Sequence, residues 1–196
     1  LGNSHANTGN TQAQFARTLA LNGEASAARS QAEAVHISLV ERFGAHHAAI
    51  GINRHTLALA DELDGQAEAA AHTLDDVLAI EFARVAPGNI LLAYAHLDRA
   101  WLRLTLNRDA EALQDIDAAD AIFSSIRSDG HPRRAGLQLA RAVLEARRGD
   151  IPSARAAIAR AIVQREAQFG GQHCFTIEAR RWLLALDSGV APTAAS

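Results

Sequence analysis

Histidines at one fixed spacing are the residues of this chain that most suggest chemistry. They are His5, His47, His131 and His173, and Asn89 takes the corresponding place between the second and third of them. Imidazole is a common zinc ligand, but successive copies lie 42 positions apart or more, and neither a CxxC nor an HExxH motif occurs. Asn is a strong helix N-cap, and Pro132 after His131 suits the first position of a helix. The pattern therefore predicts helix caps, with no metal site and no cofactor.

Candidate nucleophiles lack the neighbours that would activate them. Ser124, Ser125 and the single cysteine, Cys174, stand in no motif that places a base beside a nucleophile. The acidic residues fall on predicted solvent faces, and Gly170-Gly171 belongs to a recurring turn rather than to a phosphate-binding loop. We expect no catalytic residue here, and any enzymatic activity would belong to another part of a parent protein.

The histidine spacing is one part of a 42-residue period that runs through the chain. A turn residue recurs at Gly23, Gly65, Asn107 and Gly149. Small residues recur as four pairs, twelve apart: Ala16/Ala28, Ala58/Ala70, Ala100/Ala112 and Ala142/Ala154. A period of this length without insertions indicates a repeat architecture, in which each unit buries its apolar face against its neighbours.

The repeating unit resembles the tetratricopeptide repeat (TPR), in the 42-residue branch seen in kinesin light chains and in many bacterial regulators. The paired alanines match that family's two closely packed positions, and Gly130-His131-Pro132 matches the end of its Gly-x-x-His-Pro turn. The resemblance covers residues 1 to about 187. It implies two-helix units stacked into a right-handed superhelix, and the recognition of proteins or peptides rather than catalysis.

Apolar periodicity and turn residues predict two helices in each repeat and a final capping helix. The expected ranges are 7–22, 24–43, 48–64, 66–84, 90–106, 109–126, 132–148, 151–168 and about 174–187. Phe15 and Ile80 are expected among the inward-facing residues. We predict one all-α solenoid domain over residues 1–189, with repeats at about 1–43, 44–85, 86–127 and 128–169, a capping helix within 170–189, and a disordered tail at 190–196.

The third and fourth repeats depart from the family pattern in their first helices. Positions that normally carry large apolar residues facing the partner helix hold polar ones, among them His96, Arg99 and Arg103. Apolar residues stand instead at positions that line the concave groove. The predicted groove and partner-binding residues are Ile52, Leu59, Leu63, Tyr94, Leu97, Trp101, Leu139 and Val143.

Two interpretations of this apolar stripe remain open. Rotated first helices would make the stripe core, since an apolar stripe at helical spacing is most often buried. An unchanged register, held by Ala100 and Ala142, would make it an exposed trough that binds a partner helix or a second copy of the chain, with Trp101 as the anchor.

The charges of the chain are unevenly distributed. Residues 61–120 carry 13 acidic residues and 4 arginines, whereas residues 127–181 carry 11 arginines and 5 acidic residues. Solvated helix faces would account for this, and so would two ends that meet different partners. The basic part lacks stacking aromatics and glycine-rich basic loops, so a nucleic-acid partner is not expected. No apolar run is long enough to form a signal or a membrane span, and we expect a cytoplasmic protein without a membrane partner.

These observations favour a non-catalytic protein-interaction domain of a larger bacterial signalling or regulatory protein. All 19 basic residues are arginine, which suggests a GC-rich genome, and the absence of Met suggests a piece of a longer chain. The alternatives are a module that senses a ligand or peptide, and a homodimerisation domain that uses the same concave groove.

Overall fold

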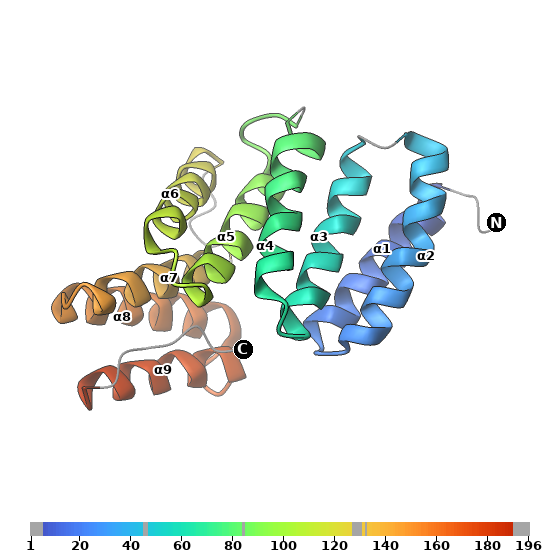
Figure 1. Ribbon diagram of the computed structural model, residues 1–196. Coiled ribbons are helices and arrows are strands. Elements are labelled where there is room, and N and C mark those ends of the chain that lie inside the picture. Colours follow the sequence, from blue (N-terminus) through green and yellow to red (C-terminus); the bar gives the residue numbers. More distant parts are fainter. Residues whose placement is uncertain (1–5, 45–46, 84, 127–130, 132, 190–196) are drawn as a thin grey trace. The chain divides into compact units, whose positions relative to one another are not determined.

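The computed structural model of the protein describes residues 6–44, 47–83, 85–126, 131 and 133–189, and the only regular structure in them is helical (Figure 1). The helices are α1 (Ala6–Leu21), α2 (Ala25–Phe43), α3 (Ala48–Leu63), α4 (Ala67–Asp76), the π-helix η1 (Val77–Glu81), α5 (Ile90–Thr105), α6 (Asp109–Ser125), α7 (Arg133–Arg147), α8 (Ile151–Phe169) and α9 (Cys174–Asp187). This confirms the predicted all-α fold. The predictions for His5, Pro132 and the tail at 190–196 lie outside the described residues.

The chain divides into two compact units, one ending at Pro87 and the other beginning at Gly88. The boundary lies two residues after the predicted junction between the second and third repeats, which was placed at about residues 85 and 86. Unit 1 holds α1 to η1 and unit 2 holds α5 to α9. In both units, helices that follow one another in sequence pack together, and α1 also packs against α3, as α5 does against α7. Our expectation of one continuous domain stays a prediction.

Alanine at the two periodic positions of each repeat lets the paired helices approach closely. All eight of these alanines are buried: Ala16, Ala28, Ala58, Ala70, Ala100, Ala112, Ala142 and Ala154. In unit 1, Val35 and Leu39 of α2 pack with Ala13 of α1 and Ile50 of α3. Phe15 is 53% exposed, so its predicted inward orientation is wrong. The reason is that α2 meets the face of α1 that carries Ala13, Ala16 and Ala20.

The second helix of repeat two ends in a π-helix, which its sequence pattern did not predict. The amide of Phe82 donates to the carbonyl of Val77 at 2.9 Å, five residues earlier rather than four. This wider turn allows Val77 and Phe82 both to be buried, whereas Ile80 is 40% exposed. The prediction that Ile80 faces inward is therefore wrong, and Phe82 takes the inward place.

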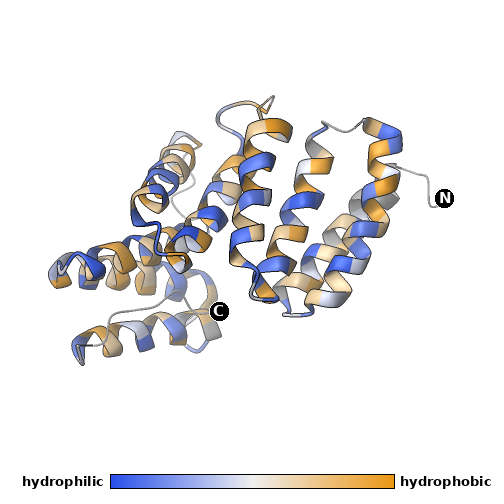
Figure 2. Cartoon of the chain, in the orientation of Figure 1, coloured by the Kyte–Doolittle hydropathy of each residue, from blue (hydrophilic) through white to orange (hydrophobic). Residues whose placement is uncertain are grey.

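The core of unit 2 has two parts, one on each side of α7. Leu104 of α5, Ile116 and Phe123 of α6, and Leu144 of α7 belong to the first part. Ile158 of α8 and Leu186 of α9 belong to the second, together with small residues of α7 and α8. Figure 2 shows that the helices carry hydrophobic and hydrophilic residues interspersed along their length, as expected of helices buried on one side.

The recurring turn residues end helices and the recurring histidines cap helix N-termini, as the sequence predicted. Gly23, Gly65, Asn107 and Gly149 all adopt the left-handed backbone conformation that closes a helix end, with φ between 58° and 82°. The Nδ1 atoms of His47, His131 and His173 accept hydrogen bonds from backbone amides two residues later, at 3.2–3.3 Å, and Asn89 does the same through Oδ1 at 3.0 Å. The capping prediction is confirmed for these four residues.

Two of the capping histidines stack on the last residue of the preceding helix. Phe43 and Phe169, the last residues of α2 and α8, stack on His47 and His173 with ring centroids 4.6 and 4.7 Å apart. Both helices are 19 residues long. The register positions of these phenylalanines hold Val85 and Arg127 in the second and third repeats, where the helices end at residues 81 and 125. In the third repeat, His131 stacks instead on Phe123 of the 17-residue helix α6, so only a phenylalanine at this register position accompanies the longer helices.

Within the described residues, no helix combines the length and apolarity that crossing a bilayer requires. The same residues contain no group of three or more His, Cys, Asp or Glu side chains arranged to hold a metal ion.

Candidate functional site

The predicted groove residues lie in three different environments. Leu97, Leu139 and Val143 are buried in the core of unit 2, so they do not form an exposed trough, although Leu97 and Leu139 border the hollows described below. Ile52, Leu59, Tyr94 and Trp101 are half-buried, and Leu63 is 47% exposed. Whether any of them meets a partner stays a prediction.

The polar residues that replace the family's apolar stripe in repeat three converge on one buried acid. Asp115 of α6 has a side chain only 2% exposed. It accepts hydrogen bonds from Arg99 at 2.6 and 2.9 Å, from Arg103 at 2.8 Å and from the His96 ring at 2.8 Å. The register of α5 is therefore kept, because these residues face the partner helix as the repeat pattern requires. An ionic contact replaces the apolar one.

Charge compensation fixes the ionisation of Asp115. Burial by itself would raise the pKa of Asp115, but the hydrogen bonds from His96 and Arg99 and the charges of Arg99 and Arg103 hold it below its ordinary value. Asp98 on α5 is also almost fully buried. The expectation that the carboxylates lie on solvent faces is therefore wrong for Asp98 and Asp115.

The acidic and basic parts of the sequence meet inside unit 2. Arg134 and Arg141 of α7 pair with Asp120 of α6, each at 3.3 Å, and Arg141 also reaches Asp117 at 2.8 Å. Arg147 pairs with Asp109 at the other end of α6. Much of the uneven charge distribution is thus compensated between neighbouring helices, an arrangement that neither interpretation of the sequence foresaw.

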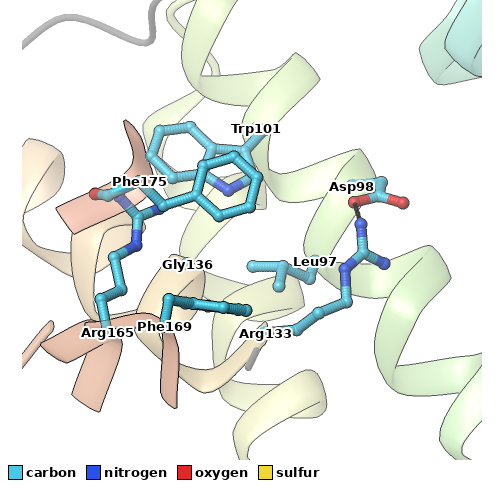
Figure 3. A pocket seen from close by; sticks show the side chains of 8 residues that line it. All are labelled: Leu97, Asp98, Trp101, Arg133, Gly136, Arg165, Phe169 and Phe175. Atoms are coloured by element: carbon cyan, nitrogen blue, oxygen red, sulfur yellow. Dashed lines mark hydrogen bonds and ion pairs between the residues drawn. The ribbon is translucent and has the colours of Figure 1, made fainter. Parts of the chain in front are cut away.

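A hollow of about 240 Å³ opens in unit 2 among α5, α7, α8 and the start of α9 (Figure 3). Its lining residues are Leu97, Asp98, Trp101, Arg133, Gly136, Arg165, Phe169 and Phe175. A second hollow of about 170 Å³ shares Trp101, Gly136 and Arg165 with the first and extends along α9 to Glu178 and Trp182. The two hollows adjoin each other, and we call the first the unit-2 hollow.

Three aromatic side chains form much of the wall of the unit-2 hollow. Phe175 is 48% exposed and Phe169 is 37% exposed, and their rings meet edge to face with centroids 5.8 Å apart. Trp101 is held in place by Trp182, whose ring lies at 78° to it with centroids 5.9 Å apart. Large, partly exposed aromatic surfaces around a concavity are typical of sites that bind a side chain of another molecule.

Two arginines with different pairings border the same hollow. Arg133 donates to Asp98 at 2.5 Å, lies over the Tyr94 ring at 4.9 Å, and has one buried guanidinium nitrogen, Nη1, without a hydrogen-bond partner. Arg165 donates to the backbone carbonyl of Phe175 and to Glu178 at 3.0 Å, and its guanidinium lies 5.4 Å from the centre of the Phe175 ring. The contacts of Arg165 hold Phe175, whose ring lies at the hollow (Figure 3).

The lining of the two hollows is mainly aromatic and aliphatic. It consists of aromatic and aliphatic side chains, two paired guanidiniums and two carboxylates, with no hydroxyl, thiol or imidazole among the residues of either hollow. Such groups bind rings, aliphatic chains and polar atoms.

Sequence reasoning identified Leu97, Trp101 and Leu139 of this region, but it missed Arg133, Gly136, Arg165, Phe169 and Phe175. The missed residues come from helix ends and from three different helices, whereas the predicted stripe followed single helices. The 42-residue register offered one signal, because Gly136 occupies the position held by Ile52 and Tyr94 in the preceding repeats.

No family model and no curated protein matches the sequence. Solved structures do match the fold. Two crystal structures of nearly identical TPR-like repeats, from a Podosopora anserina protein described as a kinesin light chain, superpose with a TM-score of 0.67 at 20% sequence identity. One of them is a single-substitution variant. The match covers 91% of this chain and 84% or 85% of the other chains. The chain therefore has the fold of the TPR-like helical repeats.

Proposed function

We propose that the protein is a non-catalytic recognition domain that binds a protein or peptide segment at the unit-2 hollow. The observation that carries this proposal is the hollow itself, where partly exposed Phe169 and Phe175 face a concavity in a helical-repeat fold. Exposed aromatics around a well-formed pocket provide apolar contact area at a low cost in side-chain entropy, which is what the central contacts of an interface need.

The wider setting belongs to the same proposal. Arginine as the only basic residue supports a GC-rich bacterial source, and the resemblance to repeats of bacterial regulators supports a cytoplasmic regulatory parent protein. The predicted residues Ile52, Leu59 and Leu63 of unit 1 retain partly exposed apolar surface and are proposed as a separate contact surface of that unit.

A displayed library of random short peptides, selected against the full 196-residue chain, tests the proposal directly. We expect enriched peptides to bind the purified chain in isothermal titration calorimetry and to lose about tenfold or more in affinity in Phe175→Ala, because partly buried aromatic contacts at an interface contribute more than 1 kcal/mol each. Leu184→Ala is the matched control, since Leu184 is also a large exposed residue of α9 but does not line either hollow.

Failure to enrich any binding peptide, or equal effects of the two substitutions, would contradict the proposal. Light scattering on the same samples distinguishes the homodimer alternative. A dimer that Phe175→Ala dissociates would show that the hollow binds a second copy rather than a foreign peptide.

A further inference from the structure

We propose that the unit-2 hollow binds a single aromatic ring, of phenylalanine or tyrosine size, presented by the partner peptide. This inference rests on the proposed recognition function and names the side chain that the hollow selects. It comes from comparing the third repeat with the fourth within unit 2.

The 42-residue register places a residue of each first helix at the same site. Tyr94 of α5 and Gly136 of α7 are equivalent by this register. A glycine inside a helix is less favourable than alanine. At Gly136 there is nevertheless room for a side chain, because an added Cβ would meet only Leu97 Cδ2, at an ordinary 3.6 Å. The fourth repeat therefore lacks a side chain where the third repeat has an aromatic ring.

In the third repeat, the surroundings of Tyr94 define what such a ring contacts. The Tyr94 ring lies 6.3 Å from Phe123 and 5.5 Å from His131, measured between ring centroids, and Arg133 lies over it at 4.9 Å. Its hydroxyl oxygen lies 2.9 Å from His131 Nε2. Since His131 Nδ1 accepts the capping hydrogen bond, Nε2 carries the proton and donates to the tyrosine oxygen.

The fourth repeat retains these surroundings with two members exchanged. The residues equivalent to Phe123 and Arg133 are Arg165 and Phe175, and both line the unit-2 hollow. One aromatic ring and one guanidinium are thus present in each repeat, but at swapped positions. His173 stands where His131 stands and lies 5.1 Å from the Phe175 ring. A ring entering the hollow would meet an aromatic ring and a guanidinium, as Tyr94 does, while His173 lies behind Phe175 rather than in the lining.

Charge and volume also favour an uncharged ring. Both guanidiniums already have acidic partners, Asp98 for Arg133 and Glu178 for Arg165, so an anionic group would meet a carboxylate beside each of them. A guanidinium remains attractive to the face of an aromatic ring while it keeps such a partner. The volume of about 240 Å³, bounded by Trp101, Phe169 and Phe175, provides space for a ring with stacking surfaces around it.

The test uses p-cresol, the side-chain analogue of tyrosine, and methylcyclohexane, an aliphatic ring of similar size. Each is titrated into the full chain while NMR amide shifts and the fluorescence of Trp101 and Trp182 are followed. We expect saturable shifts at Gly136, Arg165 and Phe175 with p-cresol, and at least about threefold weaker binding of methylcyclohexane, because only the aromatic face attracts Arg165. Equal binding of the two probes, or no saturable shift with p-cresol, would overturn the inference.

Substitution at the empty position gives an independent readout. Gly136→Tyr supplies the ring that the register lacks and should abolish the p-cresol shifts. Ala159→Tyr, on the exposed face of α8, is the control for an added tyrosine and should leave them unchanged. If Gly136→Tyr fails to fold, Gly136→Leu fills the same space and serves in its place. Undiminished p-cresol binding in the folded variant would overturn the inference.

The peptides selected against the chain separate this inference from the proposed function. Peptides that share an aromatic residue and lose binding in Gly136→Tyr support both. Peptides that bind without an aromatic residue, or that bind Gly136→Tyr equally well, contradict the aromatic inference but still support peptide recognition. Saturable p-cresol binding without any binding peptide would support the selectivity of the hollow for a ring and would contradict the proposed recognition of peptides.

Discussion

At the scale of single residues, the environment of a side chain departs most from what its sequence position suggests. Asp115 lies in an acidic stretch of α6, which suggests a surface position. It is instead buried, and His96, Arg99 and Arg103 all bind its carboxylate. The sequence showed that these three α5 residues are polar at positions where the repeat family has apolar ones. It could not show their partner, because that partner lies on another helix and its position depends on how the two helices are rotated.

The His131 cap predicts a pH dependence of stability. Burial, followed by the charge of Arg133, lowers the pKa of His131 below its ordinary value of 6.5 in the folded chain. As the pH falls, the unfolded chain takes up this proton first. The stabilisation is therefore complete above about pH 6.5 and is lost as the pH falls below that value toward the lower pKa of the folded state. Protonation of Nδ1 also removes the acceptor of the Arg133 amide.

His131→Asn isolates this effect, because Asn89 caps the equivalent helix without titrating in this range. Urea unfolding of both proteins should show the advantage of the parent over His131→Asn shrinking between about pH 7.5 and about pH 5.5. The difference cancels the contributions of the other titrating groups. An advantage that stays constant or grows toward acid would contradict the assignment of a neutral, capping imidazole.

At the scale of elements, the 42-residue register predicted the helices, their turns and their caps. These features depend on local backbone chemistry, which the sequence carries directly. The early end of the second helix in repeat two was not predictable in the same way. The π-turn at Val77 accompanies the burial of Val77 and Phe82, and burial depends on neighbouring helices rather than on the local sequence.

Helix α9 covers the last repeat, and its removal should expose that repeat. Ala179 and Leu186 of α9 pack with Ala157, Ile158 and Ala161 of α8. A chain ending at His173 should therefore melt at a lower temperature and aggregate at lower concentration than the parent, because the apolar face of α8 meets water. A chain ending at Gly189 is the matched control and should behave as the parent does. Equal melting and solubility of the shorter chain would show that α9 is not a cap.

At the scale of the whole molecule, the charge distribution contributes to stability within unit 2. Arg134, Arg141 and Arg147 pair with aspartates of α6 that are one-third exposed or more. Exposed pairs contribute little each, about 0–1 kcal/mol, and salt screens them over about 8 Å at physiological ionic strength. We expect the melting temperature to fall as sodium chloride is raised from about 0.01 M to about 0.15 M.

Arg141→Gln should reduce this salt dependence, since Arg141 contacts both Asp117 and Asp120. Arg160→Gln is the matched control, because the described partner of Arg160 is the uncharged Gln138. Differential scanning fluorimetry across the salt series gives both slopes. Identical slopes in the parent and Arg141→Gln would mean that these pairs do not contribute to the stability of the protein.

The candidate site is where sequence reasoning was least complete. A stripe along one helix can be recognised from spacing, and Leu97, Trp101 and Leu139 were identified in this way. The unit-2 hollow, however, is formed by residues from α5, α7, α8 and α9, and one of them contributes by having no side chain at all. A missing side chain leaves no apolar pattern in the sequence, and only comparison of equivalent positions between repeats makes it visible.

Gly136 has a consequence for how repeat proteins diverge after duplication. Copies of an ancestral unit begin with the same interior, so a copy can acquire a ligand site by losing one side chain rather than by assembling a new set of contacts. A copy that keeps a side chain at that position shows the shape that fills it, and Tyr94 beside Phe123 and Arg133 is the example in this chain. Aligning the repeats of one protein with each other can therefore reveal candidate ligand sites. Removing one interior ring from a repeat is a way to design such a site.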